Sequence, residues 1–121
     1  MKIVVIGAGP GGYEAAIKAA KLGAKVTVVE KDELGGTCLN RGCMPTKSLL
    51  ASSEVLTTIN NADKFGVYVN GEVNADFSDM INRKDKLVSQ LVKGIDFLLK
   101  KNGTPKKTDI APRFFRGAIR S

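Results

Sequence analysis

Two cysteines are the residues of this sequence best suited to covalent chemistry. Cys38 and Cys43 stand five positions apart, with Gly42 between them. Five residues of a regular helix rise about 7.5 Å, whereas a disulfide requires Cα atoms about 4.4–6.8 Å apart. We therefore expect the chain between the two thiols to be looped or bent, with Gly42 supplying the conformational freedom. Such a close pair in an intracellular protein indicates redox or catalytic chemistry, and two ordinary thiols are the alternative.

The surroundings of the two cysteines suggest different roles for them. Cys43 is expected near the start of a helix, where the helix dipole and Lys47, one turn further on, would favour its thiolate. Cys38, in the looser part of the segment, is then the thiol better placed to meet a substrate. Lys47 could instead be a solvated surface lysine. The sequence has no histidine, and two thiols without an imidazole cannot complete a four-ligand zinc site within one chain.

A glycine-rich turn precedes the cysteines. Residues 7–12 read Gly-Ala-Gly-Pro-Gly-Gly and match the pattern G-x-G-x-x-G, after a β-forming run and before an alanine-rich segment. In such a turn the first glycine allows a sharp bend, the second admits a pyrophosphate to the backbone, and the third lets helix and strand pack closely. The pattern does not separate NAD from FAD. It predicts a dinucleotide site that comprises Gly7, Gly9, Pro10, Gly11 and Gly12.

An acidic residue lies at the distance that such a site requires. Glu30 is 18 residues beyond Gly12, at the expected end of the second strand, where it could accept hydrogen bonds from an adenosine ribose. Lys31, the next residue, is assigned to the same site. A glycine-rich turn without a ligand is the alternative. The strand before the turn, the helix after it and the position of the acid all favour the dinucleotide site.

The elements that must position these residues are those of an α/β fold. Short apolar strands alternate with helical patterns, which is typical of a parallel sheet. The expected strands are Lys2 to Ile6 and Lys25 to Val29. The expected helices are Tyr13 to Leu22, Gly42 to Ile59 and Ser78 to Lys101, with a loop from Lys31 to Thr37 and an extended stretch from Val67 to Val73 that turns at Asn70-Gly71. The third helix has an apolar face made of Ile81, Val88, Leu91, Val92, Ile95, Leu98 and Leu99.

The composition is that of an ordinary globular domain and excludes several classes of function. Hydrophobic residues make up 43% of the chain and charged residues 26%. No apolar run approaches the ~18–20 residues of a membrane span, so we expect a cytoplasmic protein without a membrane partner. The net charge of +7 divides into +3 for residues 1–103 and +4 for residues 104–121. Because the main part has no basic stripe with interleaved aromatic residues, no nucleic-acid partner is expected.

The segment around the cysteines closely resembles the redox motif of the pyridine nucleotide–disulfide oxidoreductases. It reads Gly-Thr-Cys-Leu-Asn-Arg-Gly-Cys-Met-Pro-Thr-Lys over residues 36–47. The family includes dihydrolipoamide dehydrogenase, glutathione reductase and mercuric reductase. Residues 9–17 and the end of the third helix, residues 98–103, look most like dihydrolipoamide dehydrogenase. The resemblance covers about residues 1–103 and implies an α/β, incomplete Rossmann-like FAD-binding domain.

This resemblance implies roles for the matching residues on the cofactor side. The glycines of the turn would surround the FAD pyrophosphate, and Glu30 would hold the adenosine ribose. Gly36, Thr37 and Lys47 would contact the flavin side, with Lys47 near the reactive ring nitrogen. FAD would therefore be the cofactor, and NAD would be the co-substrate of the complete enzyme.

The resemblance also implies the path of the electrons. Cys38 would be the interchange thiol, and Cys43 would be the thiolate against the flavin. Electrons would pass from dihydrolipoamide to the Cys38–Cys43 disulfide, then to FAD and NAD. The implied partners are a lipoyl-bearing protein or a small dithiol, with the complete enzyme acting as a homodimer.

The sequence departs from the family pattern after Gly103. Family members are several times longer and add a second FAD-contacting segment, an NAD domain and a dimerisation domain that donates a His–Glu pair. They also continue with a β-strand, whereas Thr104 to Pro112 does not have the pattern of one. We therefore expect a partial FAD/NAD(P)-binding domain at 1–103 and a basic tail at 104–121. An out-of-frame ending is the favoured origin of the tail, ahead of a genuine short reading frame or a functional basic appendage.

Two hypotheses about function follow. In the first, the chain is an enzyme segment that is catalytic only within a complete homodimer, so that alone it is inactive and retains FAD weakly or not at all. In the second, it is a non-catalytic product, either a truncated remnant or a small flavin-binding or interaction module. Within the family, a mercuric or glutathione reductase-like enzyme is the alternative to a dihydrolipoamide dehydrogenase.

Overall fold

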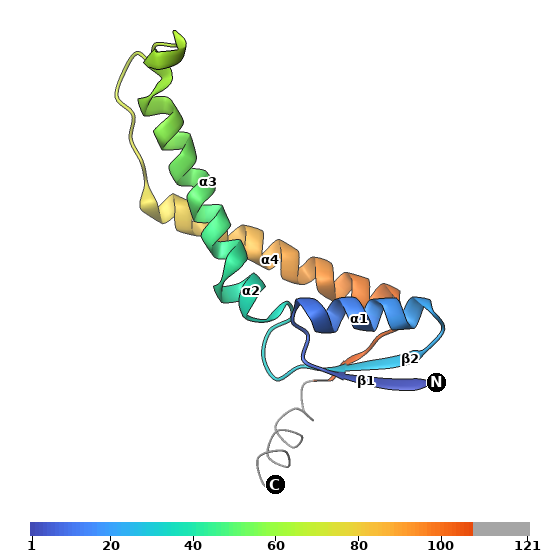
Figure 1. Ribbon diagram of the computed structural model, residues 1–121. Coiled ribbons are helices and arrows are strands. Elements are labelled where there is room, and N and C mark those ends of the chain that lie inside the picture. Colours follow the sequence, from blue (N-terminus) through green and yellow to red (C-terminus); the bar gives the residue numbers. More distant parts are fainter. Residues whose placement is uncertain (108–121) are drawn as a thin grey trace, which may run out of the picture.

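The computed structural model describes residues 1–107, so expectations for residues 108–121 lie outside the described part of the chain. A small parallel sheet carries helices on one face, and two of the helices extend away from it as an arm (Figure 1). The elements in chain order are β1 (Lys2–Ile6), α1 (Pro10–Lys21), β2 (Lys25–Val29), α2 (Gly36–Arg41), α3 (Cys43–Asn60), the 3-10 helix η1 (Ala62–Phe65), α4 (Phe77–Lys101) and β3 (Lys106–Lys107). This order confirms the predicted α/β class and its parallel β-α-β start.

Helix α1 begins earlier than the sequence pattern suggested, and helix α2 was not predicted. Helix α1 starts at Pro10 rather than Tyr13, because the end of the glycine turn is itself the first turn of the helix. Proline is favoured at this position, since its missing N–H has no acceptor there in any case. The predicted loop from Lys31 to Thr37 is also too long, because α2 begins at Gly36.

The sheet is built around β2, which pairs with a parallel strand on each side. Strand β1 aligns Lys2 with Lys25 and continues in register along β2. Strand β3 lies at the other edge of β2 and aligns Lys106 with Val28. The order β1-β2-β3 therefore places the strand that directly precedes Glu30 at the centre of the sheet.

The short strand β3 corrects one of the expectations from the sequence. The N–H of Val28 donates to the carbonyl of Pro105 at 3.1 Å, and the N–H of Glu30 donates to the carbonyl of Lys107 at 3.2 Å. The prediction of no strand between Thr104 and Pro112 is thus wrong at Lys106 and Lys107. Proline has no N–H to donate but keeps its carbonyl, so it can lie at the edge of a sheet where it only has to accept a hydrogen bond from the neighbouring strand.

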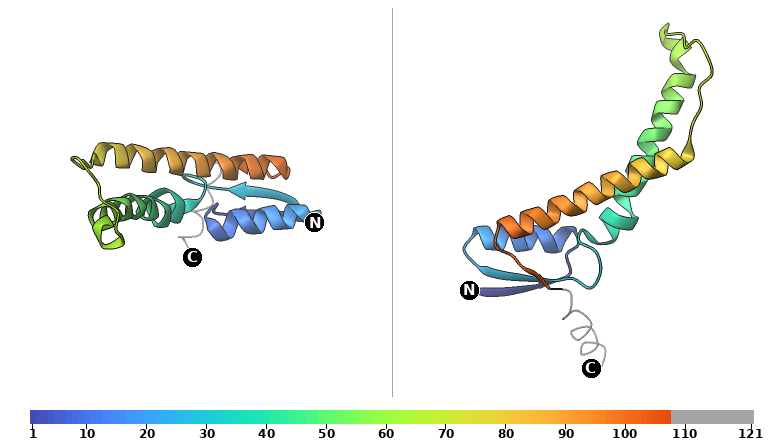
Figure 2. Two further views of the ribbon diagram at one scale, coloured as in Figure 1. Left: turned by 90° about the horizontal axis from the view of Figure 1, so that it is seen from above. Right: turned by 180° about the vertical axis from the view of Figure 1, so that it is seen from behind.

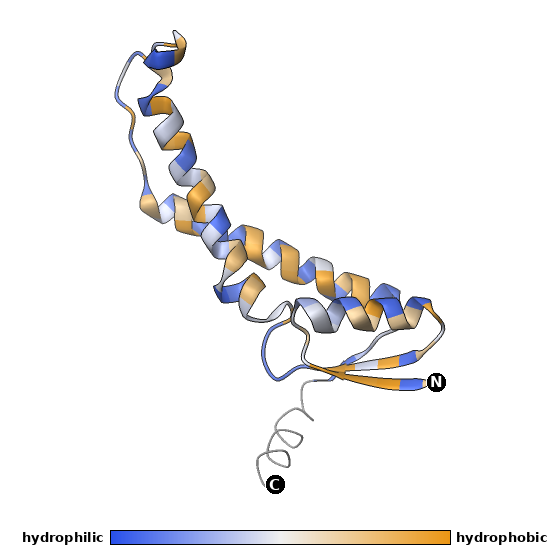
Figure 3. Cartoon of the chain, viewed as in Figure 1, coloured by the Kyte–Doolittle hydropathy of each residue, from blue (hydrophilic) through white to orange (hydrophobic). Residues whose placement is uncertain are grey.

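The core lies between the sheet and the two helices that cover it. Helices α1 and α4 lie on the same side of the sheet (Figures 1 and 2), and hydrophobic residues run along β1 and β2 (Figure 3). The buried cluster consists of Ala8, Ala16, Val26, Val28, Leu34, Leu39, Ile95 and Leu99. Strand β1 alternates, because Ile3 and Val5 pack against this cluster while Val4 and Ile6 are 58% and 53% exposed. On the opposite face, Val4 and Ile6 of β1 are therefore open, whereas Val29 of β2, in register with Ile6, is only 2% exposed.

Helix α4 is amphipathic, but its buried stripe is narrower than predicted. Ile95 and Leu99 are buried and Val92 packs against them, as expected. Leu91 and Leu98 belong to the predicted apolar face but are exposed. They lie at the edges of the apolar stripe, where no other element of the described chain packs closely enough to bury them.

The arm consists of α3, whose C-terminal half and η1 lie farthest from the sheet, and the N-terminal half of α4, which packs against α3 (Figure 1). The guanidinium of Arg83 in α4 donates to the buried Ser48 of α3, at 3.1 Å to the hydroxyl and 3.3 Å to the carbonyl. Residues 67–73, expected to be extended, form no strand and are exposed. A short isolated ribbon buries too little surface to be stable without a sheet beside it. Among the described residues, no helix is long and apolar enough to cross a membrane.

Candidate functional site

The glycine turn connects β1 to α1 and packs tightly against itself. Gly7 has a φ of 94°, and its N–H donates to the carbonyl of Val29 at 2.7 Å. A Cβ placed at Gly12 would lie 1.9 Å from the carbonyl oxygen of Gly7. Position 12 therefore requires a glycine, for the close packing that the sequence pattern predicts for the third glycine.

The first turn of α1 leaves its backbone accessible. Gly9 is the N-cap, no side chain caps the helix, and the first turn holds no acidic residue. A Cβ at Gly9 or at Gly11 would meet no atom within 4 Å. An open helix N-terminus presents unpaired N–H groups and the positive end of the helix dipole. This end of α1 can therefore accept a phosphate group closely against the backbone.

Glu30 follows β2 and is firmly held. It is only 7% exposed, and its carboxylate accepts hydrogen bonds from two backbone amides. The N–H of Ala8, in the glycine turn, lies 2.6 Å from Oε2, and the N–H of Asp32 lies 2.9 Å from Oε1. A carboxylate offers about four acceptor positions, so these two bonds leave capacity for a ligand hydroxyl.

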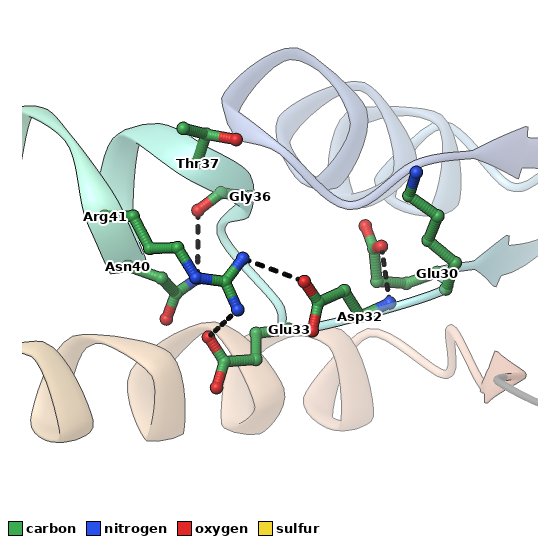
Figure 4. A pocket seen from close by; sticks show the side chains of 8 residues that line it. Glu30, Asp32, Glu33, Gly36, Thr37, Asn40 and Arg41 are labelled. Atoms are coloured by element: carbon green, nitrogen blue, oxygen red, sulfur yellow. Dashed lines mark hydrogen bonds and ion pairs between the residues drawn. The ribbon is translucent and has the colours of Figure 1, made fainter.

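A small pocket of about 130 Å³ lies beside Glu30 (Figure 4). It brings together four residues predicted for the site and four that the sequence reasoning missed. The predicted residues are Glu30, Lys31, Gly36 and Thr37. The missed residues are Asp32, Glu33, Asn40 and Arg41. The signal available in the sequence was an arginine between the two cysteines and two acidic residues shortly before the glycine pair.

The side chain of Arg41 contacts two acidic residues of the loop between β2 and α2. Its Nη1 lies 2.9 Å from Oδ2 of Asp32, and its Nη2 lies 3.7 Å from Oε2 of Glu33 (Figure 4). The hydrogen bond from Arg41 and its positive charge lower the pKa of Asp32, and the same contacts raise the pKa of Arg41. The loop is therefore tied at its charged end to the last residue of α2.

The same loop is also tied from its inner side. The Nδ2 of Asn40 donates to the carbonyls of Leu34 at 3.0 Å and Gly36 at 2.9 Å. The N–H of Gly35 donates to the carbonyl of Ala8 in the glycine turn at 2.8 Å. The glycine turn, the loop and α2 thus form one connected unit.

The two cysteines lie on either side of a break between helices. Cys38 is inside α2, Cys43 is the first residue of α3, and Gly42 separates the two helices. A Cβ at Gly42 would lie 3.1 Å from the carbonyl oxygen of Thr37 and 3.2 Å from the Cα of Cys38, so the bend brings the backbone close. The predicted bend at Gly42 is confirmed. The placement of Cys38 in a looser part is wrong, because it lies in a helix and is half-buried while Cys43 is exposed.

The environment of Cys38 shows that the two thiols interact. Both cysteines are free, and a side-chain hydrogen bond with Cys43 is the main reason that the pKa of Cys38 is raised. Burial raises that pKa further, while the backbone of Cys43 and the charge of Lys47 lower it. Lys47 is exposed in α3, one turn beyond Cys43. Neither thiol nor Lys47 is among the lining residues of the pocket beside Glu30.

A family model described as pyridine nucleotide-disulphide oxidoreductase matches residues 1–111 of the chain. The chain belongs to this family. The match continues past Gly103 and includes all of β3. Membership is consistent with an α/β fold that begins with a glycine turn and carries a pair of nearby thiols.

Individual family members are similar to the chain over most of its length. It is 55% identical over 102 residues to a dihydrolipoyl dehydrogenase of Acholeplasma laidlawii, which covers 84% of this chain and 30% of that protein. It is 52% identical over 103 residues to a dihydrolipoyl dehydrogenase of Bacillus subtilis, which covers 84% and 22%. The crystal structure of LpdA from Mycobacterium tuberculosis superposes with a TM-score of 0.79 at 28% identity and covers 88% of this chain and 23% of that one. The chain therefore spans less than a third of the length of these relatives.

Proposed function

We propose that this chain is the FAD-binding and dithiol–disulfide part of an NAD-linked dihydrolipoamide dehydrogenase. The observation that carries the proposal is the break at Gly42, where the backbone passes close to Cys38 and separates the helix of Cys38 from the helix that Cys43 begins. This break follows a glycine turn and a strand that directly precedes Glu30. The similarity to dihydrolipoyl dehydrogenases supports the choice of substrate. A glutathione or mercuric reductase-like activity is the alternative within the family.

The residues present fit FAD. The open backbone at Gly9 and Gly11 suits a diphosphate, and Glu30 keeps acceptor positions for an adenosine ribose. FAD, when bound, would supply the electron transfer between the cysteine pair and NAD. We assign its binding to Gly7, Gly9, Pro10, Gly11, Gly12, Glu30, Lys31, Gly36, Thr37, Cys38, Cys43 and Lys47.

The cysteines would carry out thiol–disulfide exchange with the substrate. In the oxidised pair, a thiolate of the dithiol substrate attacks Sγ of Cys38, and the S–S bond breaks so that Cys43 leaves as a thiolate. The second substrate thiol then displaces Cys38, which releases a cyclic disulfide and leaves the pair reduced by two electrons. The pKa of Cys38 is raised, mainly by its neighbour Cys43, so this thiol ionises less readily than an ordinary cysteine. The assignment of the thiolate to Cys43 rests on its position at the start of α3.

The spectrum of the flavin-loaded protein tests the assignment of the two thiols. A thiolate next to an oxidised flavin gives a long-wavelength charge-transfer band. After mild reduction, we expect Cys38→Ser to retain this band and Cys43→Ser to lose it. A band that survives in Cys43→Ser and disappears in Cys38→Ser would show that the two roles are reversed.

A chimera tests whether the segment supports the complete reaction. The matching segment of the Bacillus subtilis relative is replaced by this chain, and NAD-dependent oxidation of dihydrolipoamide is measured. We expect activity in the chimera and none in its Cys38→Ser variant, with both binding FAD. A chimera that folds and binds FAD but leaves dihydrolipoamide unoxidised would contradict the proposal, and turnover with glutathione disulfide or mercuric ion would favour an alternative.

A separate question is whether the 121-residue chain is active by itself. Its short span relative to the relatives and the open apolar face at Val4 and Ile6 favour a piece that does not turn over alone. We propose that activity requires a homodimer of the longer enzyme, acting in the cytoplasm on a lipoyl-bearing protein. A purified 121-residue chain that is yellow and oxidises dihydrolipoamide would overturn this requirement. A purified chain that is colourless and inactive would support this requirement, because the chain alone would then be a non-catalytic product.

A further inference from the structure

Arg41 lies at the junction of the nucleotide pocket and the cysteine motif, and the proposed function gives it no role. It is the last residue of α2 and directly precedes the bend at Gly42. We propose that Arg41 is a positioning residue that holds the carboxylate of Glu30 in place through Asp32. The consequence for nucleotide binding rests on the proposed function, whereas the positioning of Glu30 does not.

A continuous series of contacts links Arg41 to Glu30. Nη1 of Arg41 donates to Oδ2 of Asp32 at 2.9 Å, and the backbone N–H of the same aspartate donates to Oε1 of Glu30 at 2.9 Å. The other carboxylate oxygen of Glu30 accepts from the N–H of Ala8 at 2.6 Å. Arg41 therefore fixes the side chain of Asp32, and the backbone N–H of Asp32 orients the carboxylate of Glu30.

Glu30 needs this support because its carboxylate is buried. At 7% exposure, it depends on its two amide donors in place of water. The Ala8 donor belongs to the tightly packed glycine turn, but the Asp32 donor belongs to residues 31–33 of the loop, whose side chains are exposed. If Asp32 turned away, Oε1 would lose its partner and the carboxylate would be free to rotate.

The type of side chain at position 41 matters. A guanidinium is planar and can contact two carboxylates at once, and here it reaches Glu33 at 3.7 Å as well as Asp32. An ammonium group in its place would keep the charge but lose the fixed fork. The pair is half exposed on both sides, with 61% exposure at Arg41 and 51% at Asp32, so its effect is modest and screened by salt.

Amide hydrogen exchange of the whole chain tests the positioning directly, without any ligand. In Arg41→Gln we expect the Asp32 amide to exchange roughly two- to fivefold faster, the range that an exposed ion pair can account for. Arg41→Lys should be intermediate. The matched control is Lys100→Gln, which removes one positive charge from the exposed pair with Asp96 at the far end of α4 and should leave Asp32 unchanged. Equal exchange at Asp32 in wild type and Arg41→Gln would overturn the proposal.

Nucleotide binding then tests the consequence separately. FAD and ADP both carry the adenosine ribose, so Arg41→Gln should weaken both by the same factor, roughly two- to fivefold. This difference should shrink in about 1 M salt, where screening acts within about 3 Å. Weakening of FAD alone would place the effect at the flavin end and contradict the proposed link through Glu30. If neither the wild-type chain nor its chimera with the Bacillus subtilis relative binds either nucleotide, the proposed function fails, while the exchange result still decides the role of Arg41.

Discussion

At the scale of single residues, the two thiols differ in what surrounds them. Cys38 is half-buried within α2 and shares a hydrogen bond with the exposed Cys43, whose backbone begins α3. A buried thiol that shares a proton ionises less readily, while the backbone of its neighbour acts in the opposite sense. The chemistry of the pair therefore depends on the bend at Gly42, which holds the two sulfurs together.

Removal of the Cys43 side chain should make Cys38 more acidic. In Cys43→Ala the hydrogen bond that contributes most to the raised pKa of Cys38 is lost, while the lowering effects of the position-43 backbone and of Lys47 remain. The pH midpoint for alkylation of Cys38 by iodoacetamide should therefore move to lower pH. Cys43→Ser keeps an acceptor for the Cys38 thiol and should move the midpoint less. A midpoint that stays fixed or rises in Cys43→Ala would contradict the contact between the thiols.

Two glycines in the first turn of α1 should respond differently to a methyl group. Gly12→Ala forces a Cβ to 1.9 Å from the carbonyl of Gly7, so the free energy of unfolding should fall by about 1–3 kcal/mol. Gly11→Ala places its Cβ in open space and should leave stability unchanged or raise it by up to about 1 kcal/mol. Urea unfolding followed by circular dichroism measures both. Equal losses would show that the turn relaxes around the methyl group.

At the scale of elements, the helices differ in how they begin. Helices α1, α2 and α3 start after Gly9, Gly35 and Gly42, without a side-chain cap. Helix α4 instead starts after Asp76, whose side chain accepts from the N–H groups of the first turn. A side-chain cap stabilises a helix but occupies its amides, so the three uncapped helices forgo that stability at the ends that surround the candidate site.

The cap of α4 should therefore contribute measurably to stability. Asp76→Ala removes the acceptor for the N–H groups of Ser78 and Asp79, which lie at 2.8 and 3.2 Å. We expect the free energy of unfolding to fall by about 1 kcal/mol in urea. The control is Glu54→Ala, which removes one negative charge from the exposed middle of α3 and should change it by less than about 0.5 kcal/mol. A loss as large in the control would point to overall charge instead of the cap.

At the scale of the whole molecule, the sheet has one covered face and one open face. Helices α1 and α4 cover one side, while Val4 and Ile6 remain exposed on the other (Figure 2). The central strand β2 is completed at its second edge only when the chain returns from α4 through the fully buried Thr104. Residues 104–107 are therefore part of the folded unit, beyond the boundary expected at Gly103.

Shortening the chain tests the contribution of β3. A chain that ends at Gly103 loses the acceptors of the Val28 and Glu30 amides, and these two hydrogen bonds together contribute about 1–3 kcal/mol. A chain that ends at Lys107 keeps both bonds and should retain the stability of the full chain in urea. The two truncations thus differ by only four residues. Equal stability of both shortened chains would show that β3 adds nothing to the fold.

The local parts of the fold could be predicted because they depend on neighbouring residues. Strands β1 and β2 begin and end where the apolar runs do, and α3 and α4 differ from their predicted bounds by one residue at most. Hydrophobic period, a glycine break and a capping residue all act over a few positions of the chain. Strand β3 could not be predicted, since two lysines become a strand only because the free edge of β2 lies beside them.

The sequence by itself determined the chemical identity of the site, namely a glycine turn, an acid after the second strand and two thiols separated by a bend. The tertiary structure alone decided which hydrogen bonds these groups form and how far they are buried. It binds Glu30 to the amides of Ala8 and Asp32, buries Cys38 more than Cys43, and brings Arg41 to the loop after β2. Residue types fix which bonds are possible, but a hydrogen bond between distant segments forms only where folding places donor and acceptor within about 3 Å.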